Sequence, residues 1–105
     1  MRRDIGGVAD VPAGEVRRFG VDGVDVAVVN LGEGVFLGLN DLCSHAEASL
    51  SEGEVDVLEE TIECPRHGSR FDLRSGKPRS LPATHPVRTF RIEVEGDRLI
   101  VEAEG

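Results

Sequence analysis

Two short segments of the chain each combine one cysteine with one histidine. Residues 43–45 read CSH and residues 64–67 read CPRH, and 18 residues separate the two segments. They contain both cysteines of the chain, Cys43 and Cys64, and two of its three histidines, His45 and His67. Thiolate is a soft, negatively charged ligand and imidazole is a neutral one, and both bind zinc and iron. The four side chains therefore predict a metal site assembled from two loops.

Two kinds of metal site take two cysteines and two histidines. Zinc binds them in a tetrahedral site, but zinc fingers usually place a cysteine pair before a histidine pair, whereas each segment here supplies one of each. A 2Fe–2S cluster of mixed ligation instead holds one iron with two cysteines and the other iron with two histidines. The order of the residues favours this cluster. Structural zinc, and buried cysteines and histidines without a metal, stay open as alternatives.

The residues around the four candidate ligands form longer stretches that occur together in one protein family. The stretches are CSHAEASLSEG (residues 43–53), CPRHGSRFDLRSG (64–76) and LPA (81–83). In this order they resemble the Rieske-type 2Fe–2S ferredoxins, in particular the single-domain, disulfide-free branch that serves as the ferredoxin component of non-haem iron oxygenases. The resemblance implies one 2Fe–2S cluster, with Cys43, His45, Cys64 and His67 as its metal ligands.

Three further residues are expected to take part in binding the cluster. Pro65 is expected to stiffen the second segment, and Gly68 to let the backbone turn tightly beside it. Ser69 stands where high-potential members of the family have a serine that donates a hydrogen bond to a bridging sulfide, so the same role is expected here. Such a bond lowers the charge density on the sulfide and makes reduction easier.

Three other positions depart from the high-potential members. Those proteins carry an extra cysteine in each ligand segment, joined as a disulfide, where this chain has Ala48 and Arg66. They also place a tyrosine hydroxyl on a cysteine sulfur, at the position of Phe71. A sulfur without that hydrogen bond keeps more negative charge, which makes reduction harder. We therefore expect a reduction potential in the lower part of the range of Rieske centres, about −150 to +300 mV.

The pattern along the rest of the chain indicates strands joined by turns. No stretch shows sustained helical periodicity, and the sequence contains 13 glycines, five prolines and many valines and isoleucines. Strands are expected through Ile5, Val8 and Val11, and at residues 15–19, 24–31, 35–39, 55–57, 61–63, 71–73, 87–94 and 98–102. This pattern predicts an all-β protein, a sandwich or barrel. The family resemblance implies a single Rieske domain of residues 1–105, in which a small cluster-binding subdomain of about residues 41–80 is inserted in a larger antiparallel base.

Composition and charge exclude several classes of function. The formal net charge of −8 argues against nonspecific nucleic-acid binding, which needs a positive surface. No apolar run approaches the roughly 20 residues of a membrane span, and no hydrophobic segment typical of a secretory signal follows the first residues. We therefore expect a cytoplasmic protein without membrane contact. In that reducing compartment two cysteines are more often metal ligands than a structural disulfide.

Charged residues around the expected cluster are unevenly distributed. Residues 52–63 include six acidic side chains, whereas residues 66–79 carry Arg66, Arg70, Arg74, Lys77 and Arg79 against a single acid, Asp72. A solvated surface of mixed charge explains this pattern simply, and a rim that steers a redox partner is the functional alternative. The third histidine, His85, is expected at the surface of a proline-rich loop and is not counted as a ligand.

These features predict a soluble one-electron carrier rather than an enzyme. By resemblance, it accepts electrons from a flavin-dependent ferredoxin reductase and delivers them singly to a terminal oxygenase, such as an aromatic-ring-hydroxylating dioxygenase. A chain of 105 residues has no room for the mononuclear iron domain of the oxygenase itself. Two alternatives remain: a Rieske ferredoxin that serves iron–sulfur cluster assembly or another oxidase, and a non-catalytic small subunit of a nitrite-reductase-like enzyme. A monomer is the default expectation.

Overall fold

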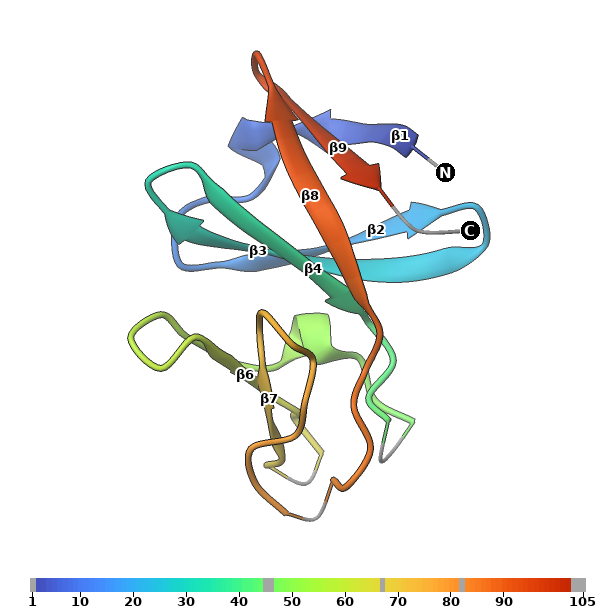
Figure 1. The fold of residues 1–105 in the computed structure, drawn as a ribbon, viewed down its shortest axis with the longest axis vertical. Coiled ribbons are helices and arrows are strands. Elements are labelled where there is room, and N and C mark those ends of the chain that lie inside the picture. Colours follow the sequence, from blue (N-terminus) through green and yellow to red (C-terminus); the bar gives the residue numbers. More distant parts are fainter. Residues whose placement is uncertain (1, 45–46, 67, 82, 103–105) are drawn as a thin grey trace.

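The chain forms two antiparallel sheets in the computed structural model, which describes residues 2–44, 47–66, 68–81 and 83–102 (Figure 1). The larger sheet has six strands in the order β1-β9-β8-β4-β3-β2. They are β1 (Arg2–Gly7), β2 (Val16–Val21), β3 (Val24–Gly32), β4 (Val35–Asn40), β8 (Thr89–Glu95) and β9 (Arg98–Glu102). The smaller sheet contains β5 (Val55–Asp56), β6 (Thr61–Glu63) and β7 (Arg70–Asp72) in chain order. The predicted all-β fold class is confirmed.

The smaller sheet is formed by the segment that connects β4 to β8. It lies at one end of the longest axis of the molecule, whose extents are 39 × 29 × 19 Å (Figure 1). The short 3₁₀ helix η2 (Leu50–Glu52) lies between the two sheets in this view. The boundaries of the cluster-binding subdomain stay a prediction. Among the described residues, no helix has the length and apolar character needed to cross a membrane.

Strand β3 joins the two halves of the hydrophobic core. Its side chains alternate between the faces of the sheet, as the pleat of a strand requires. Ala27 and Val29 belong to the buried cluster that includes the smaller sheet, and Val26 and Val28 belong to the buried cluster inside the larger sheet. All four are fully buried. This explains why the sequence of β3 is almost continuously apolar.

The first strand ends earlier in the chain than the apolar pattern predicts. β1 ends at Gly7, and residues 8–10 form the 3₁₀ helix η1 (Val8–Asp10), so the prediction of one strand through Ile5, Val8 and Val11 is wrong. The Asp10 carboxylate accepts the Gly7 N–H at 2.8 Å, and this local bond competes with strand pairing. Val8 and Val11 still face the larger core.

Candidate metal centre

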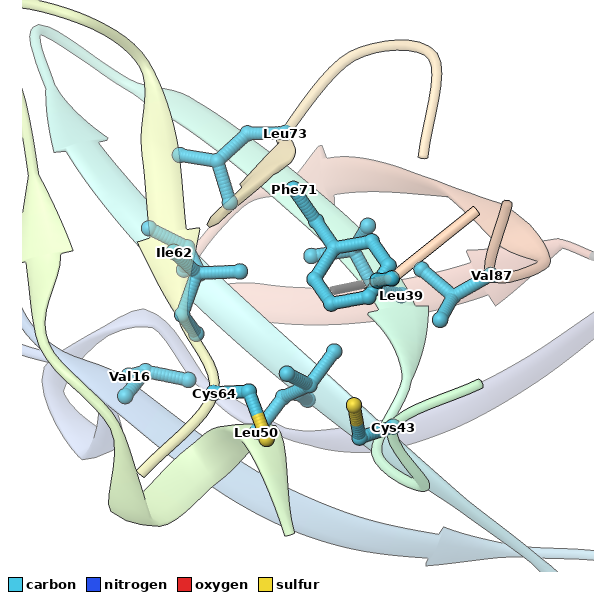
Figure 2. Close-up of a cluster of buried hydrophobic side chains, with 12 residues drawn as sticks. Val16, Leu39, Cys43, Leu50, Ile62, Cys64, Phe71, Leu73 and Val87 are labelled. Atoms are coloured by element: carbon cyan, nitrogen blue, oxygen red, sulfur yellow. The ribbon is translucent and has the colours of Figure 1, made fainter. Parts of the chain in front are cut away.

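The structure brings the two cysteines into one buried cluster of side chains. Cys43 follows β4 and Cys64 follows β6 directly, and both are buried outside any disulfide. Leu50 and Ile62, which are fully buried, belong to the same cluster. Figure 2 shows both sulfur atoms at one edge of this cluster, with Leu50 between them in that view. Two thiols from separate loops are thus placed for a shared site.

The first ligand loop, residues 41–51, is closed by hydrogen bonds across its base. The N–H of Cys43 donates to the Ala48 carbonyl at 2.9 Å, and the N–H of Leu50 donates to the Asp41 carbonyl at 2.7 Å. The Asp41 carboxylate accepts the N–H of Ser51 at 2.8 Å. Both ends of the loop are therefore fixed to each other.

Two backbone hydrogen bonds close the second ligand loop, residues 64–69, at its ends. The Cys64 N–H donates to the Ser69 carbonyl at 2.7 Å, and the Gly68 N–H donates to the Cys64 carbonyl at 3.0 Å. Gly68 has a φ of +73°, a left-handed conformation that favours glycine. Pro65, at the exposed part of the turn, fixes one backbone angle. The roles of Pro65 and Gly68 at the cluster stay predictions.

A third segment, residues 80–86, is tied to both ligand loops by serine hydroxyls. Ser44 donates to the His85 carbonyl at 2.5 Å, and Ser69 accepts the Ala83 N–H at 3.1 Å. Ser80 accepts the N–H of Arg70, the first residue after the second loop, at 2.9 Å. The imidazole of His85 is exposed, as expected of a surface residue. The sequence did not reveal these ties, because a serine next to a ligand does not show which backbone it meets.

Ser69 is fully buried in this arrangement. Its oxygen accepts the Ala83 N–H, and no acceptor for its own proton is found among the described residues. A hydroxyl can donate one bond while it accepts another. Ser69 therefore keeps a buried donor available, which fits the predicted bond to a cluster sulfide.

Two close backbone approaches hold the second loop and its hairpin in place. At Gly53, a Cβ atom would lie 1.7 Å from the Glu63 carbonyl oxygen, so only glycine fits beside the residue that precedes Cys64. At Gly76, with a φ of +75°, a Cβ atom would lie 2.2 Å from the Val87 carbonyl oxygen. Phe71 is fully buried in the same hydrophobic cluster as both cysteines and lies near Leu39 and Val87 in Figure 2.

The charges of the smaller sheet pair with one another across its strands. The pairs are Arg70 with Glu63 at 3.5 Å, Arg74 with Glu60 at 2.6 Å, and Arg79 with Glu59 at 3.6 Å and with Asp72 at 3.5 Å. The hydrogen bond from Arg74 holds the pKa of the Glu60 carboxyl below its usual value. Most of the basic residues that the sequence grouped around the second loop are thus neutralised by the acids of residues 52–63 and by Asp72. The mixed-charge interpretation is supported.

The four predicted ligands are not all within the part of the chain that the structure describes. His45 and His67 lie outside the described residues, so their position relative to Cys43 and Cys64 stays a prediction. The donor chemistry that is described fits a 2Fe–2S cluster of mixed ligation. Two buried thiols from separate loops, tied through a shared third segment, provide the cysteine half of the ligand set.

Comparison with known proteins identifies relatives over nearly the whole chain. The family model described as "Rieske [2Fe-2S] domain" matches residues 2–91. The 3-phenylpropionate/cinnamic acid dioxygenase ferredoxin subunit of Escherichia coli strain K12 is 44% identical over 95 residues, which cover 90% of this chain and 87% of that protein.

Solved structures agree with these relatives. The ferredoxin of carbazole 1,9a-dioxygenase from Nocardioides aromaticivorans IC177 is 35% identical, with a TM-score of 0.93 and coverage of 99% of both chains. A ferredoxin in the complex of reduced oxygenase and oxidized ferredoxin in carbazole 1,9a-dioxygenase is 36% identical, with a TM-score of 0.87 and coverage of 95% of this chain and 91% of that chain.

Proposed function

Since this chain belongs to the family of Rieske [2Fe-2S] domains, we propose that it passes single electrons from a flavin-dependent ferredoxin reductase to a terminal non-haem iron oxygenase, such as an aromatic-ring-hydroxylating dioxygenase. It is an electron-transfer component and not the catalytic subunit. The observation that carries the proposal is the 44% identity, over 90% of the chain, to a dioxygenase ferredoxin subunit.

The chain's own residues account for how a cluster is held. Cys43 and Cys64 would hold one iron, and His45 and His67 would hold the other. When bound, the 2Fe–2S cluster supplies a one-electron redox couple. The buried apolar side chains around both thiols, Leu50 and Ile62 among them, keep water from this side of the site. The ties through residues 80–86 limit movement of the loops between redox states.

The surface around the ligand loops favours a contact that is partly apolar. Leu42, next to Cys43, is 59% exposed, and Leu81, in the segment that ties the loops, is 79% exposed. Arg66 is exposed and has no ion pair among the described residues, whereas three neighbouring arginines are paired. Weak redox encounters use small interfaces. We therefore expect only a modest effect of salt on electron transfer, and a slower transfer by Arg66→Glu.

The oligomeric state and the cellular compartment are part of the proposed function. The protein works as a monomer, and it works in the cytoplasm, where its two cysteines outside any disulfide are kept reduced for metal binding. Analytical ultracentrifugation of the protein with its cluster tests the first statement, and cell fractionation of the source organism tests the second.

Rapid mixing tests the function. The protein is reduced by one electron, separated from reductant and mixed with an oxidised terminal oxygenase from the same organism, and the absorbance of both is followed. Transfer within the turnover time of the oxygenase is expected. If the oxygenase stays oxidised while an iron–sulfur assembly protein from the same organism accepts the electron, the proposal fails in favour of a role in cluster assembly.

A further inference from the structure

Asp41 is an acidic side chain buried at the base of the first ligand loop. Only 2% of the residue is exposed, and few acidic residues are buried to this degree without a close partner. One carboxylate oxygen accepts the Ser51 N–H at 2.8 Å. The other lies 3.9 Å from the Arg18 guanidinium, which is beyond hydrogen-bond distance.

The carboxylate performs the capping that η2 otherwise lacks. Ser49, at the N-cap position of η2, makes no side-chain capping bond. Asp41 reaches across the loop to the N–H of Ser51 instead, while its backbone carbonyl accepts the Leu50 N–H. A negative charge beside the first N–H groups of a turn is favourable. This explains how an acid is tolerated there.

Asp41 is also close to one of the proposed metal ligands. Only Leu42 separates Asp41 from Cys43 along the chain, so the Cα atoms of Asp41 and Cys43 are at most about 7 Å apart. Water screens a buried charge much less than an exposed one. A buried negative charge in the ligand loop itself opposes the addition of an electron to the site.

We propose that Asp41 is a positioning residue that holds the first ligand loop closed and at the same time keeps the reduction potential of the site low through its charge. The inference rests on the proposed ligand set. Arg18 opposes this charge only in part, because its side chain is 54% exposed and its guanidinium is 3.9 Å away. Asp41 acts on the same property as the missing tyrosine hydroxyl at Phe71, but through charge and not through a hydrogen bond to sulfur.

Electrochemistry of the cluster-loaded protein separates the two roles of Asp41. Asp41→Asn keeps an oxygen for the Ser51 N–H and removes the charge, so we expect it to retain the cluster and the EPR line shape. Its reduction equilibrium should rise threefold to tenfold, which for one electron is about 28 to 59 mV. Asp41→Ala also removes the bond to Ser51, and we expect it to lose the cluster faster on heating than Asp41→Asn.

The matched control is Glu47→Gln, which removes one negative charge from an exposed side chain of the same loop. Glu47→Gln should raise the reduction potential less than Asp41→Asn does. This rise should vanish at high salt, whereas the rise caused by Asp41→Asn should persist. An Asp41→Asn potential no higher than that of Glu47→Gln would overturn the inference. If Asp41→Asn does not retain the cluster, Arg18→Gln decides: a lowered potential at low salt supports the proposal, and an unchanged one overturns it.

These outcomes are distinct from a failure of the proposed function, because the potential is measured without any partner protein. A wild-type protein that forms no 2Fe–2S centre would overturn both the ligand set and this inference. A wild-type protein with the centre, whose potential does not respond to Asp41→Asn, would overturn this inference alone.

Discussion

Replacing Ser69 by alanine tests how far a single buried hydroxyl controls the site. Ser69 is fully buried and its oxygen accepts the Ala83 N–H at 3.1 Å, while none of the described residues accepts its proton, which we assign to a cluster sulfide. Ser69→Ala removes both bonds. The loss of the acceptor leaves the Ala83 N–H buried without a partner, which costs about 1–3 kcal/mol of stability.

The effect on the reduction potential follows from the difference between the two redox states. A hydrogen bond between neutral groups contributes about 0.5–1.5 kcal/mol and one to a charged group about 1.5–3 kcal/mol. With two thiolates and two neutral imidazoles, the oxidised cluster has no net charge and the reduced one is negative. The difference of about 1–1.5 kcal/mol favours reduction, and it corresponds to about 43–65 mV for one electron. Ser69→Ala should lower the potential by this amount.

Ser80→Ala is the matched control for this experiment. Its hydroxyl also accepts one backbone N–H, from Arg70 at 2.9 Å, but it is only partly buried. Both variants should unfold at lower denaturant concentration, and only Ser69→Ala should change the potential measured by protein-film voltammetry. Equal potentials for Ser69→Ala and wild type, with the cluster retained, would refute the assignment of the Ser69 proton to the cluster.

Three more results are expected. Gly53→Ala should lower the free energy of unfolding by about 3 kcal/mol or more, because the new Cβ atom would overlap a backbone oxygen. Gly23→Ala, the control, should lower it only by the roughly 1–2 kcal/mol that a left-handed conformation costs. Urea unfolding compares the two variants, and equal losses of stability would contradict the close approach at Gly53. The hydrogen bond from Arg74 lowers the pKa of Glu60 from 4.5, so this pair stabilises the fold above pH 4.5 and its contribution is lost as the pH falls through the lowered pKa. The urea midpoint should therefore drop less steeply below pH 4.5 in Glu60→Gln than in wild type. If the midpoints of the two proteins fall in parallel with pH, the pair does not stabilise the fold. Phe71→Tyr should raise the reduction potential if its hydroxyl reaches a cysteine sulfur, and voltammetry showing an unchanged or lower potential with the cluster retained would remove Phe71 as the reason for a low potential.

Local patterns in the sequence predicted most of the β-structure. The turn at Val21-Asp22-Gly23 appears as expected, with positive φ at both Asp22 and Gly23, because few other conformations close a two-residue hairpin. The apolar run of β3 predicted a buried strand. These features depend on neighbours in the chain, so the sequence carries them directly.

Features that depend on distant partners were not predictable in this way. Val87 reads as the start of a strand, but its N–H donates to the Gly76 carbonyl at 2.9 Å and β8 begins only at Thr89. The charges of residues 52–63 and 66–79 looked like separate patches, whereas the pairing of β6 with β7 brings them together. The burial of Asp41 likewise follows from the closure of a loop whose other end is ten residues away.

The most direct test of the account is low-temperature EPR of the anaerobically purified protein after reduction by dithionite, with iron and sulfide assayed on the same sample. Mixed cysteine and histidine ligation predicts a rhombic signal with a lower mean g value than all-cysteine clusters give, and two irons and two sulfides per chain. His45→Ala and His67→Ala should each abolish this signal. A colourless, EPR-silent protein with stoichiometric zinc would contradict the account and leave a structural metal site in its place.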